Sequence, residues 1–457
     1  MTKKKDEDIK DAREIAMGIL INIIEECNYS HTVLSRTLKQ YQYMEKQDRA
    51  FITRICEGTI ERMITLDFIL NKYSSVKVSK MKPFIRNLLR MSVYQIKYMD
   101  QIPDSAACNE AVKLAKKRGF ANLSGFVNGV LRNVIRNPEK VVFPNEEKEP
   151  ISFLSVIYSV PEWLVTDWLK QYEYSIVKQM LEASFQDKKT TIRCNLNLVT
   201  PDQLKDMLEQ TKVIVEPGVY LPYAYKISDY NYLNQLEPFQ KGYFQIQDES
   251  SMLVGAIALV KPGDYVIDVC AAPGGKSLHI AENLKSTGEV SARDVSEFKV
   301  ALIRDNINRL GCSNITVKVQ DALILDKESI QKADIVIADL PCSGLGVIGK
   351  KPDIKYNMTK EKQNDLVQLQ RDILEVVQQY VKKDGVLLYS TCTVNKEENI
   401  ENVRWFTKQF GFKLENIEGY LPKSLWNETT EEGYLQLIPG IHDADGFFIA
   451  RLRKSEE

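Results

Sequence analysis

The sequence predicts a multidomain chain: an all-α domain, then a small α/β domain, then a doubly wound, Rossmann-like α/β domain. Three observations predict this fold class. The 457 residues exceed what one hydrophobic core usually organises. Apolar residues recur at helical spacing in the first third of the chain, and short β-branched runs alternate with helical segments in the last half. We place the domains at 1–140, 151–242 and 243–457.

The first third of the chain is helical throughout. Ile15, Ile19 and Ile23 recur every four residues, and short polar breaks divide residues 10–137 into roughly five to seven helices. Pro138 ends the last of them, because its ring cannot continue a helix. Residues 143–150 contain two prolines and several charges and are typical of a linker.

The rest of the chain mixes strands and helices. Residues 163–171 and 201–211 have helical patterns, and 190–196 has the pattern of a strand, which predicts a small α/β insert domain. Later, β-branched runs alternate with helices, as in a parallel doubly wound sheet. These runs are Tyr265 to Val269, Glu289 to Ala292, Thr316 to Val319, Ile335 to Ala338 and Val386 to Tyr389.

Composition excludes several classes of protein. The longest apolar stretches, 17–24 and 251–260, fall short of the ~18 residues that cross a bilayer, and the lysine-rich start lacks a signal-peptide pattern. We therefore expect a cytoplasmic protein with no membrane partner. Eight cysteines without a C-x-x-C pair, and only three histidines, fit neither a disulfide framework nor a zinc site. Five cysteines are predicted to be small buried hydrophobes: Cys27, Cys56, Cys108, Cys194 and Cys312.

Charge is distributed unevenly along the chain. Residues 1–140 carry 25 basic and 16 acidic side chains, against 36 and 46 in the remainder. This excess favours a polyanionic partner such as nucleic acid, although a solvated basic face would give the same count. The candidate contacts are Lys113, Lys116, Lys117, Arg118, Arg132 and Arg136.

A glycine turn follows the first strand of the last domain. Its small residues let the backbone approach a ligand at the carboxyl end of the strand, where doubly wound sheets usually bind. Its end resembles a phosphate-binding P-loop, but that motif requires glycine where Cys270 stands, and Pro273 removes an amide from the phosphate cradle. The turn consists of Cys270, Ala271, Ala272, Pro273, Gly274, Gly275, Lys276 and Ser277.

The next two strands also end in carboxylates. Asp294 stands where a carboxylate would take both ribose hydroxyls of a nucleoside, and Asp321 could accept from an adenine amino group. A lone strand-end aspartate is commonly a turn residue, but three strands with carboxylates at their ends favour S-adenosylmethionine as the ligand.

Two cysteines stand at the ends of the remaining strands. Asp339 and Cys342 follow the fourth strand, and Cys392 follows the fifth, so all three are expected at the same crevice. Carbon 5 of cytosine is a poor nucleophile until a thiol adds to carbon 6, after which a base must remove the proton from carbon 5 and an acid must stabilise the adduct. The residues suit this chemistry, but they leave open which thiol attacks.

Residues 244–453 resemble the catalytic domain of the m5C RNA methyltransferases (the NOL1/NOP2/Sun family). The resemblance lies in the lead-in 247–250, motif I at 268–277, motif IV at 339–346, motif VI at 390–393 and the closing strand at 445–448. The helical region resembles the RNA-binding factor NusB, and this pairing points to the bacterial 16S rRNA cytosine-5 methyltransferases. The resemblance covers nearly the whole chain and is weakest at 152–242.

The resemblance implies a role for each site residue. Cys392 would attack carbon 6, Cys342 would assist proton removal from carbon 5 and product release, and Asp339 would contact the N3 and amino edge of cytosine. DNA cytosine methyltransferases place the nucleophile in a Pro-Cys motif, so attack by Cys342 is the alternative. S-adenosylmethionine, leaving as S-adenosylhomocysteine, would be held without a metal by Cys270, Ala271, Ala272, Pro273, Gly274, Gly275, Lys276, Asp294, Asp321 and Asp339.

The resemblance also implies the partner. We expect 16S rRNA, free or in an early small-subunit precursor, as the substrate of a monomeric enzyme. The target cytosine should be unpaired or flipped out, because a thiol cannot reach carbon 6 of a stacked base. Two alternatives stay open: the same chemistry on transfer RNA, and a non-catalytic NusB-like RNA-binding factor.

Overall fold

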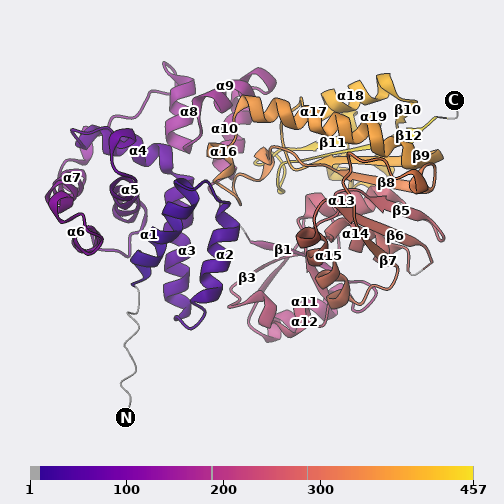
Figure 1. The fold of residues 1–457 in the computed structure, drawn as a ribbon, viewed down its shortest axis with the longest axis horizontal. Helices are drawn as coiled ribbons and strands as arrows, with labels where there is room; N and C mark the ends of the chain where they lie inside the picture. Colours follow the sequence, from indigo (N-terminus) through magenta and orange to yellow (C-terminus); the bar gives the residue numbers. More distant parts are fainter. Residues whose placement is uncertain (1–10, 187–188, 286, 456–457) are drawn as a thin grey trace, which may run out of the picture. The chain divides into compact units, whose positions relative to one another are not determined.

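The computed structural model describes residues 11–186, 189–285 and 287–455, which form two compact units (Figure 1). The helical unit contains Met1–Phe185 and Ile348–Asn357, and the α/β unit contains Gln186–Val347 and Met358–Glu457. No helix in the described ranges is long and apolar enough to span a bilayer. The domain boundaries given above stay predictions.

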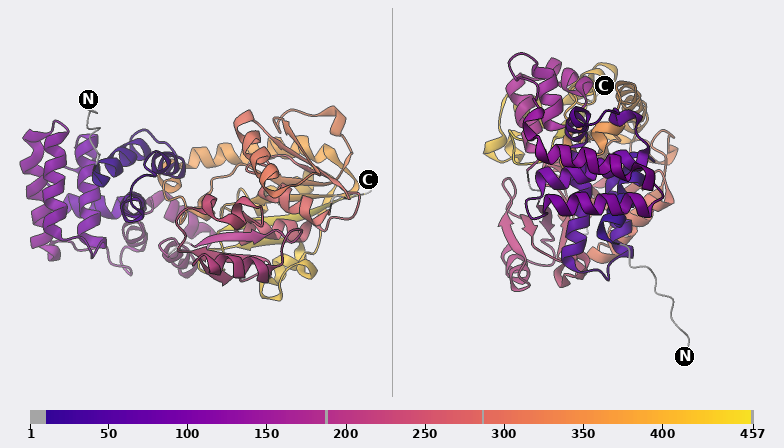
Figure 2. Two further views of the ribbon diagram at one scale, coloured as in Figure 1. Left: turned by 90° about the horizontal axis from the view of Figure 1, so that it is seen from below. Right: turned by 90° about the vertical axis from the view of Figure 1, so that its left-hand side faces the viewer.

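The helical unit confirms the predicted all-α fold, and Figure 2 shows residues 11–185 as helices joined by loops. The predicted stripe Ile15, Ile19 and Ile23 is buried in its core. Its helices are α1 (Ala12–Ile24), α2 (Ser30–Gln40), α3 (Lys46–Glu61), α4 (Met63–Tyr73), α5 (Pro83–Tyr98), α6 (Asp104–Lys117), α7 (Ser124–Arg136), α8 (Pro150–Tyr158), α9 (Glu162–Gln171), α10 (Tyr174–Ala183) and α16 (Ile354–Asn357).

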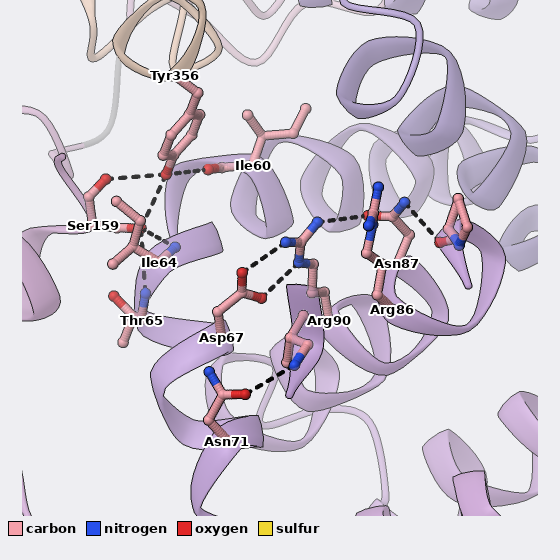
Figure 3. Close-up of polar contacts among 12 residues, drawn as sticks. Ile60, Ile64, Thr65, Asp67, Asn71, Arg86, Asn87, Arg90, Ser159 and Tyr356 are labelled. Carbon is pink, nitrogen blue, oxygen red and sulfur yellow. Dashed lines mark hydrogen bonds and ion pairs between the residues drawn. The ribbon is translucent and has the colours of Figure 1, made fainter. Parts of the chain in front are cut away.

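The short helix α16 is far from the rest of the helical unit in sequence. The Tyr356 hydroxyl lies 2.8 Å from the Ile60 carbonyl oxygen and 3.0 Å from Ser159 Oγ, and that Oγ accepts from the Ile64 amide at 2.8 Å (Figure 3). Asp353 accepts from the Ser30 amide at 3.2 Å. Residues 348–357 are therefore built into the helical unit, although they follow motif IV directly in the chain.

Replacing Tyr356 with phenylalanine should destabilise the helical unit locally by about 1–3 kcal/mol, because it leaves buried hydrogen-bonding groups of Ser159 and Ile60 without their partner. Hydrogen exchange of the amides at Ile64 and Thr65 measures the loss as faster exchange. The matched control is Tyr43→Phe, which removes a hydroxyl from a side chain that is 69% exposed. Equal exchange in the two variants would contradict this account.

The α/β unit begins with a small antiparallel sheet of order β2-β3-β1-β4. Thr200 caps α11 reciprocally with Gln203, which fixes the start of the helix that packs beside this sheet. The predicted strand and the helix after it are confirmed here. The elements are β1 (Thr190–Cys194), α11 (Pro201–Gln210), β2 (Ile214–Pro217), β3 (Ala224–Ser228), α12 (Glu237–Gln240) and β4 (Phe244–Ile246).

The large sheet has the order β10-β12-β9-β8-β5-β6-β7, with β11 paired to β12. Strands β5 to β9 pair in parallel, which confirms the Rossmann-like prediction, whereas β12 pairs antiparallel to β9. The strands are β5 (Tyr265–Asp268), β6 (Glu289–Asp294), β7 (Ile315–Val319), β8 (Ala333–Asp339), β9 (Val381–Thr391), β10 (Phe412–Leu414), β11 (Tyr434–Leu437) and β12 (Phe447–Lys454).

Helices cover both faces of the large sheet (Figure 1). In β8, Ile335 and Ile337 belong to the apolar cluster that contains α13 and α14, whereas Val336 and Ala338 belong to the cluster that contains α17 and α18. This division follows because successive strand residues point to opposite faces. The helices are α13 (Glu249–Ala258), α14 (Gly275–Asn283), α15 (Glu297–Leu310), α17 (Lys360–Val377), α18 (Ile400–Gln409) and α19 (Glu428–Glu432).

Candidate active site

The carboxyl ends of the parallel strands gather the predicted site residues. β5 leads into the glycine turn, β6 ends at Asp294, β8 ends at Asp339, and β9 ends immediately before Cys392. Because parallel strands end at one edge of the sheet, these groups lie at the same edge, where doubly wound folds usually bind ligands. Asp321 lies two residues beyond β7, and the neighbouring Gln320 amide donates to the Asp294 carbonyl at 3.0 Å.

The glycine turn brings backbone close to the carboxyl end of β5. Gly274 has φ +105°, which glycine adopts without strain, and it directly precedes the first residue of α14. The Gly274 amide donates to the Ala271 carbonyl at 2.7 Å, and the Ala271 amide donates to the Arg293 carbonyl at 2.8 Å. The turn is therefore tied to the end of β6, and the unpaired amides that begin α14 face an anionic or polar ligand favourably.

Asp268 lies buried beneath the turn. Burial is the largest influence on its carboxyl and raises its pKa to about 7, although the Ser277 hydroxyl donates to it at 2.6 Å. Its Oδ1 atom is buried and has no hydrogen-bond partner among residues 11–186, 189–285 and 287–455. A buried acceptor without a donor is costly, so this atom suits a ligand that brings a cationic or N–H donor.

Asp294 is held rigidly at the end of β6. Its Oδ2 accepts from the Ala272 amide at 2.9 Å, its Oδ1 accepts from the Val295 amide at 2.8 Å, and Lys299 Nζ lies 3.0 Å from Oδ1. A carboxylate oxygen has further lone pairs beyond these contacts, and hydroxyl groups can donate to them. The side chain is only 3% exposed, so a nucleoside would meet an oriented acceptor rather than a mobile one.

Arg293 interrupts an apolar strand, and the structure explains how its charge is accommodated. The guanidinium is 3% exposed, donates to Ser329 Oγ at 2.7 Å, and lies 3.2 Å from an Asp326 carboxylate oxygen. A buried charge needs a paired and hydrogen-bonded environment; Asp326 supplies the opposite charge, and the hydroxyls of Ser291 and Ser329 accept the hydrogen bonds. Arg293 is therefore paired inside the protein, and Asp294, the next residue of β6, keeps its own contacts with the Ala272 and Val295 amides.

The two thiols predicted to work together are in contact. Cys342 Sγ and Cys392 Sγ lie 3.3 Å apart, and both side chains are half-buried. The hydrogen bond with Cys392 is the largest cause that raises the pKa of Cys342 well above its usual value, and burial adds to it. Cys342 therefore tends to keep its proton in this arrangement, and either sulfur can be the donor in the contact between them.

A lysine–aspartate pair lies beside the thiols. Lys276 Nζ contacts Asp339 Oδ2 at 2.6 Å, and the Ser390 hydroxyl donates to Asp339 Oδ1 at 2.8 Å. Burial alone would lower the pKa of Lys276, but the charge and hydrogen bond of Asp339 and the nearby Cys392 raise it. The ammonium therefore stays charged, within electrostatic reach of Cys392.

Gly346 and Gly446 let the motif IV loop approach the segment that leads into β12. The Gly346 amide donates to the Cys392 carbonyl at 3.1 Å, and the Gly446 amide donates to the Gly346 carbonyl at 2.9 Å. A Cβ on Gly346 would lie 2.1 Å from the Gly446 carbonyl oxygen, so no larger residue fits at this crossing. Phe447, at the start of β12, directly follows this crossing. The centroid of its ring lies 5.3 Å from Lys276 Nζ.

The remaining cysteines divide into two groups. Cys56, Cys108 and Cys194 are buried, as predicted. The prediction was wrong for Cys27, which is exposed because it follows the end of α1 in a left-handed turn with φ 56°. Cys312 was also predicted to be buried, but it is only half-buried, just beyond the C-terminus of α15.

Sequence reasoning missed Glu398, which accepts hydrogen bonds from Ser343, the neighbour of Cys342, and is fully buried. Its position six residues after Cys392, in a run of polar residues, is typical of an exposed helix start. Its short distance along the chain from motif VI is the only feature of the sequence that connects Glu398 with the site.

Fold and site together define a Rossmann-like α/β protein with carboxylates and two thiols at the carboxyl edge of its sheet, the architecture of a methyltransferase, and comparison with known proteins identifies its family. Residues 256–453 match the family described as 16S rRNA methyltransferase RsmB/F, residues 10–136 match the NusB family, and residues 160–231 match the RsmF/B-like ferredoxin-like domain. The probable ribosomal RNA small subunit methyltransferase B of Bacillus subtilis is 36% identical over 445 residues, covering 97% of this chain and 98% of that protein.

A second relative and two solved structures agree with this match. The corresponding probable methyltransferase B of Synechocystis is 31% identical over 97% of this chain and 99% of its own length. The crystal structure of PH0851 superposes with a TM-score of 0.82 at 27% identity, covering 99% of this chain and 100% of that one. A methyltransferase homolog from Pyrococcus horikoshii, with a TM-score of 0.57 and 24% identity over 67% of this chain and 99% of its own, shares the fold. The chain belongs to the RsmB/F methyltransferase family.

Proposed function

We propose that this protein transfers a methyl group from S-adenosylmethionine to carbon 5 of a cytosine in 16S rRNA, through a covalent adduct with Cys392. The observation that carries the proposal is the contact between two thiols, 3.3 Å apart, beside a lysine–aspartate pair at the nucleoside-binding edge. One thiol would suffice to add to a pyrimidine; a second in contact provides a proton acceptor for the same ring.

The residues of the crevice fit the proposed cofactor. The glycine turn offers close backbone approach, Asp294 is an oriented acceptor for ribose hydroxyls, and the buried Asp268 Oδ1 atom needs a donor. Asp321, at the neighbouring strand end, would accept from the adenine amino group. When bound, S-adenosylmethionine supplies an electrophilic methyl group on a sulfonium.

Cys392 is the better candidate for the attacking thiol. Lys276 lies within electrostatic reach of it and favours its thiolate, whereas Cys342 retains its proton. The Cys392 sulfur would form a bond to carbon 6 while the electrons of the ring double bond move to carbon 5. Asp339, held by Lys276 and Ser390, would face the N3 and amino edge of the cytosine and stabilise the electron-rich adduct.

Cys342 is suited to the closing step. Its raised pKa depends first on the hydrogen bond with Cys392, and that cause disappears once Cys392 sulfur is bonded to carbon 6. The Cys342 thiol would then release its proton to solvent water, and the resulting thiolate would accept the proton from carbon 5. The electrons of that C–H bond restore the ring double bond and the bond between Cys392 and carbon 6 breaks, returning the thiolate.

The helical unit supports an RNA substrate. It matches the NusB family, and the excess of basic over acidic side chains lies in the same residues. We further propose that the enzyme acts in the cytoplasm, as a monomer, on 16S rRNA that is free or in an early small-subunit precursor, at an unpaired or flipped-out cytosine.

Tritium transfer from labelled S-adenosylmethionine tests this function. Small-subunit RNA from cells that lack the gene should accept label as 5-methylcytidine, identified by nucleoside mass spectrometry. Small-subunit RNA from cells with the gene should accept at least about tenfold less, because its target is already methylated; transfer RNA serves as the second acceptor. Label confined to transfer RNA, or found at another atom of the base, would contradict the proposal.

A further inference from the structure

Glu398 is a buried carboxylate with four hydrogen-bond donors around it. Oε1 accepts from the Ser343 hydroxyl at 2.6 Å and from Asn395 Nδ2 at 3.1 Å. Oε2 accepts from the Ser343 backbone amide at 2.8 Å and from Gln370 Nε2 at 3.1 Å. The side chain is fully buried, so water does not share these contacts.

These contacts join the two turns that carry the thiols. Ser343 directly follows Cys342, and its hydroxyl lies 2.8 Å from the hydroxyl of Thr393, which directly follows Cys392. Gln370, on α17, donates to the carbonyl of Pro341, the residue before Cys342, at 2.9 Å. One carboxylate therefore holds the Cys342 turn on both sides of the thiol and reaches the Cys392 turn through Ser343.

We propose that Glu398 is a positioning residue that keeps the Cys342 and Cys392 thiols in contact, so that both act on one pyrimidine ring. The chemical role of the two thiols in this inference rests on the proposed function. Their proximity does not, because the structure places the two sulfur atoms 3.3 Å apart. Glu398 touches neither sulfur through a hydrogen bond; it acts through Ser343 and Thr393.

The network requires a carboxylate rather than any acceptor. Both oxygens accept from two donors each, so an amide in the same place would present an NH₂ group to donors on one side. Burial raises the pKa of Glu398, while the Ser343 hydroxyl and amide oppose that rise. The charge of Glu398 also contributes to the raised pKa of Cys342, after the Cys392 hydrogen bond and burial, which helps keep Cys342 protonated at rest.

A thiol-proximity assay on the full chain tests the inference. Diamide accepts two electrons and two protons from two thiols in contact, which become a disulfide while the diazene becomes a hydrazine. Peptide mass spectrometry without reduction then measures how fast the Cys342–Cys392 disulfide forms. Glu398→Gln should slow its formation about tenfold or more, because buried donors facing an NH₂ group push the turns apart. Adducts with RNA should persist about tenfold longer in the same variant.

The neighbouring glutamate provides a matched control. Glu397 pairs with Lys360 at 2.7 Å and its side chain is 47% exposed, so Glu397→Gln should leave disulfide formation and adduct lifetime unchanged. Ser343→Ala is a second, milder variant; it keeps the backbone amide contact with Glu398 and removes the hydroxyl that reaches Thr393. We expect an intermediate slowing from it, even if Glu398→Gln does not fold.

The outcomes separate this inference from the proposed function. Slower disulfide formation together with longer-lived adducts supports the role of Glu398. Wild-type disulfide rates in both Glu398→Gln and Ser343→Ala would overturn it, and so would slower disulfide formation with unchanged adduct lifetime. If the unaltered protein methylates no RNA while its disulfide rate still depends on Glu398, the proximity claim stands and the proposed function fails.

Discussion

Replacing Cys392 with alanine is expected to lower methyl transfer by at least about 10³-fold, because it removes the thiol that we propose adds to carbon 6 of cytosine. Cofactor binding should be unchanged, since the glycine turn is held by the Ala271 amide on the Arg293 carbonyl and Asp294 is held by the Ala272 amide. Tritium transfer to small-subunit RNA measures the first effect, and calorimetric titration with S-adenosylmethionine measures the second.

The same substitution at a distant cysteine is the control for Cys392→Ala. Cys312 is half-buried just beyond α15 and takes no part in the thiol pair, so Cys312→Ala should transfer methyl groups at the wild-type rate. Residual transfer by Cys392→Ala within about tenfold of that rate would show that attack does not depend on Cys392.

Replacing Cys342 with alanine should have a different effect: it should trap a covalent protein–RNA complex. In the proposed mechanism, attack by Cys392 and methyl transfer do not require Cys342, but removal of the proton from carbon 5 does, and a positioned base typically contributes about 10²–10⁴-fold. We expect the lifetime of the complex to rise by about 10²-fold or more, observed as RNA that stays with the protein in denaturing gels.

The double variant Cys342→Ala/Cys392→Ala is the control for that complex and should form none. If an adduct accumulates with Cys392→Ala instead, the two roles are reversed. Cys342, the thiol of the Pro-Cys motif, would then be the residue that attacks carbon 6. Both single variants are therefore measured with the same RNA and over the same time course.

Much of the fold could be predicted because its signals are local. The parallel strands were visible as β-branched runs, and the structure confirms each of them between β5 and β9. The direction in which two strands pair cannot be predicted from local sequence. β12 pairs antiparallel with β9, although its sequence has the same pattern as that of a parallel strand. Only the family resemblance indicated a closing strand there.

Residues 348–357 show the same limit at the level of domains. They follow motif IV without any break in composition, so nothing in their sequence marks them as part of the helical unit. In the structure they pack in the helical unit, because Asp353 and Tyr356 find their hydrogen-bond partners there. Contacts between residues distant in sequence decide this, and hydrophobic spacing does not report them.

The candidate site divides in a similar way. Strand-end position predicted that Cys342, Cys392 and Asp339 would share a crevice, and the structure brings them together. Glu398 could not be predicted, because a glutamate among polar neighbours is usually solvated, and only tertiary packing buries it beneath the thiols. Lys276 was predicted for the cofactor, yet it contacts Asp339 beside Cys392.

The most direct test of covalent catalysis is to identify the protein residue that is bonded to RNA in the Cys342→Ala complex. After digestion of both partners, tandem mass spectrometry locates the nucleotide on a peptide. The expected result is a methylated cytidine attached to Cys392 Sγ. A nucleotide attached to any other residue, or a complex that carries no covalent bond, would contradict the proposed mechanism.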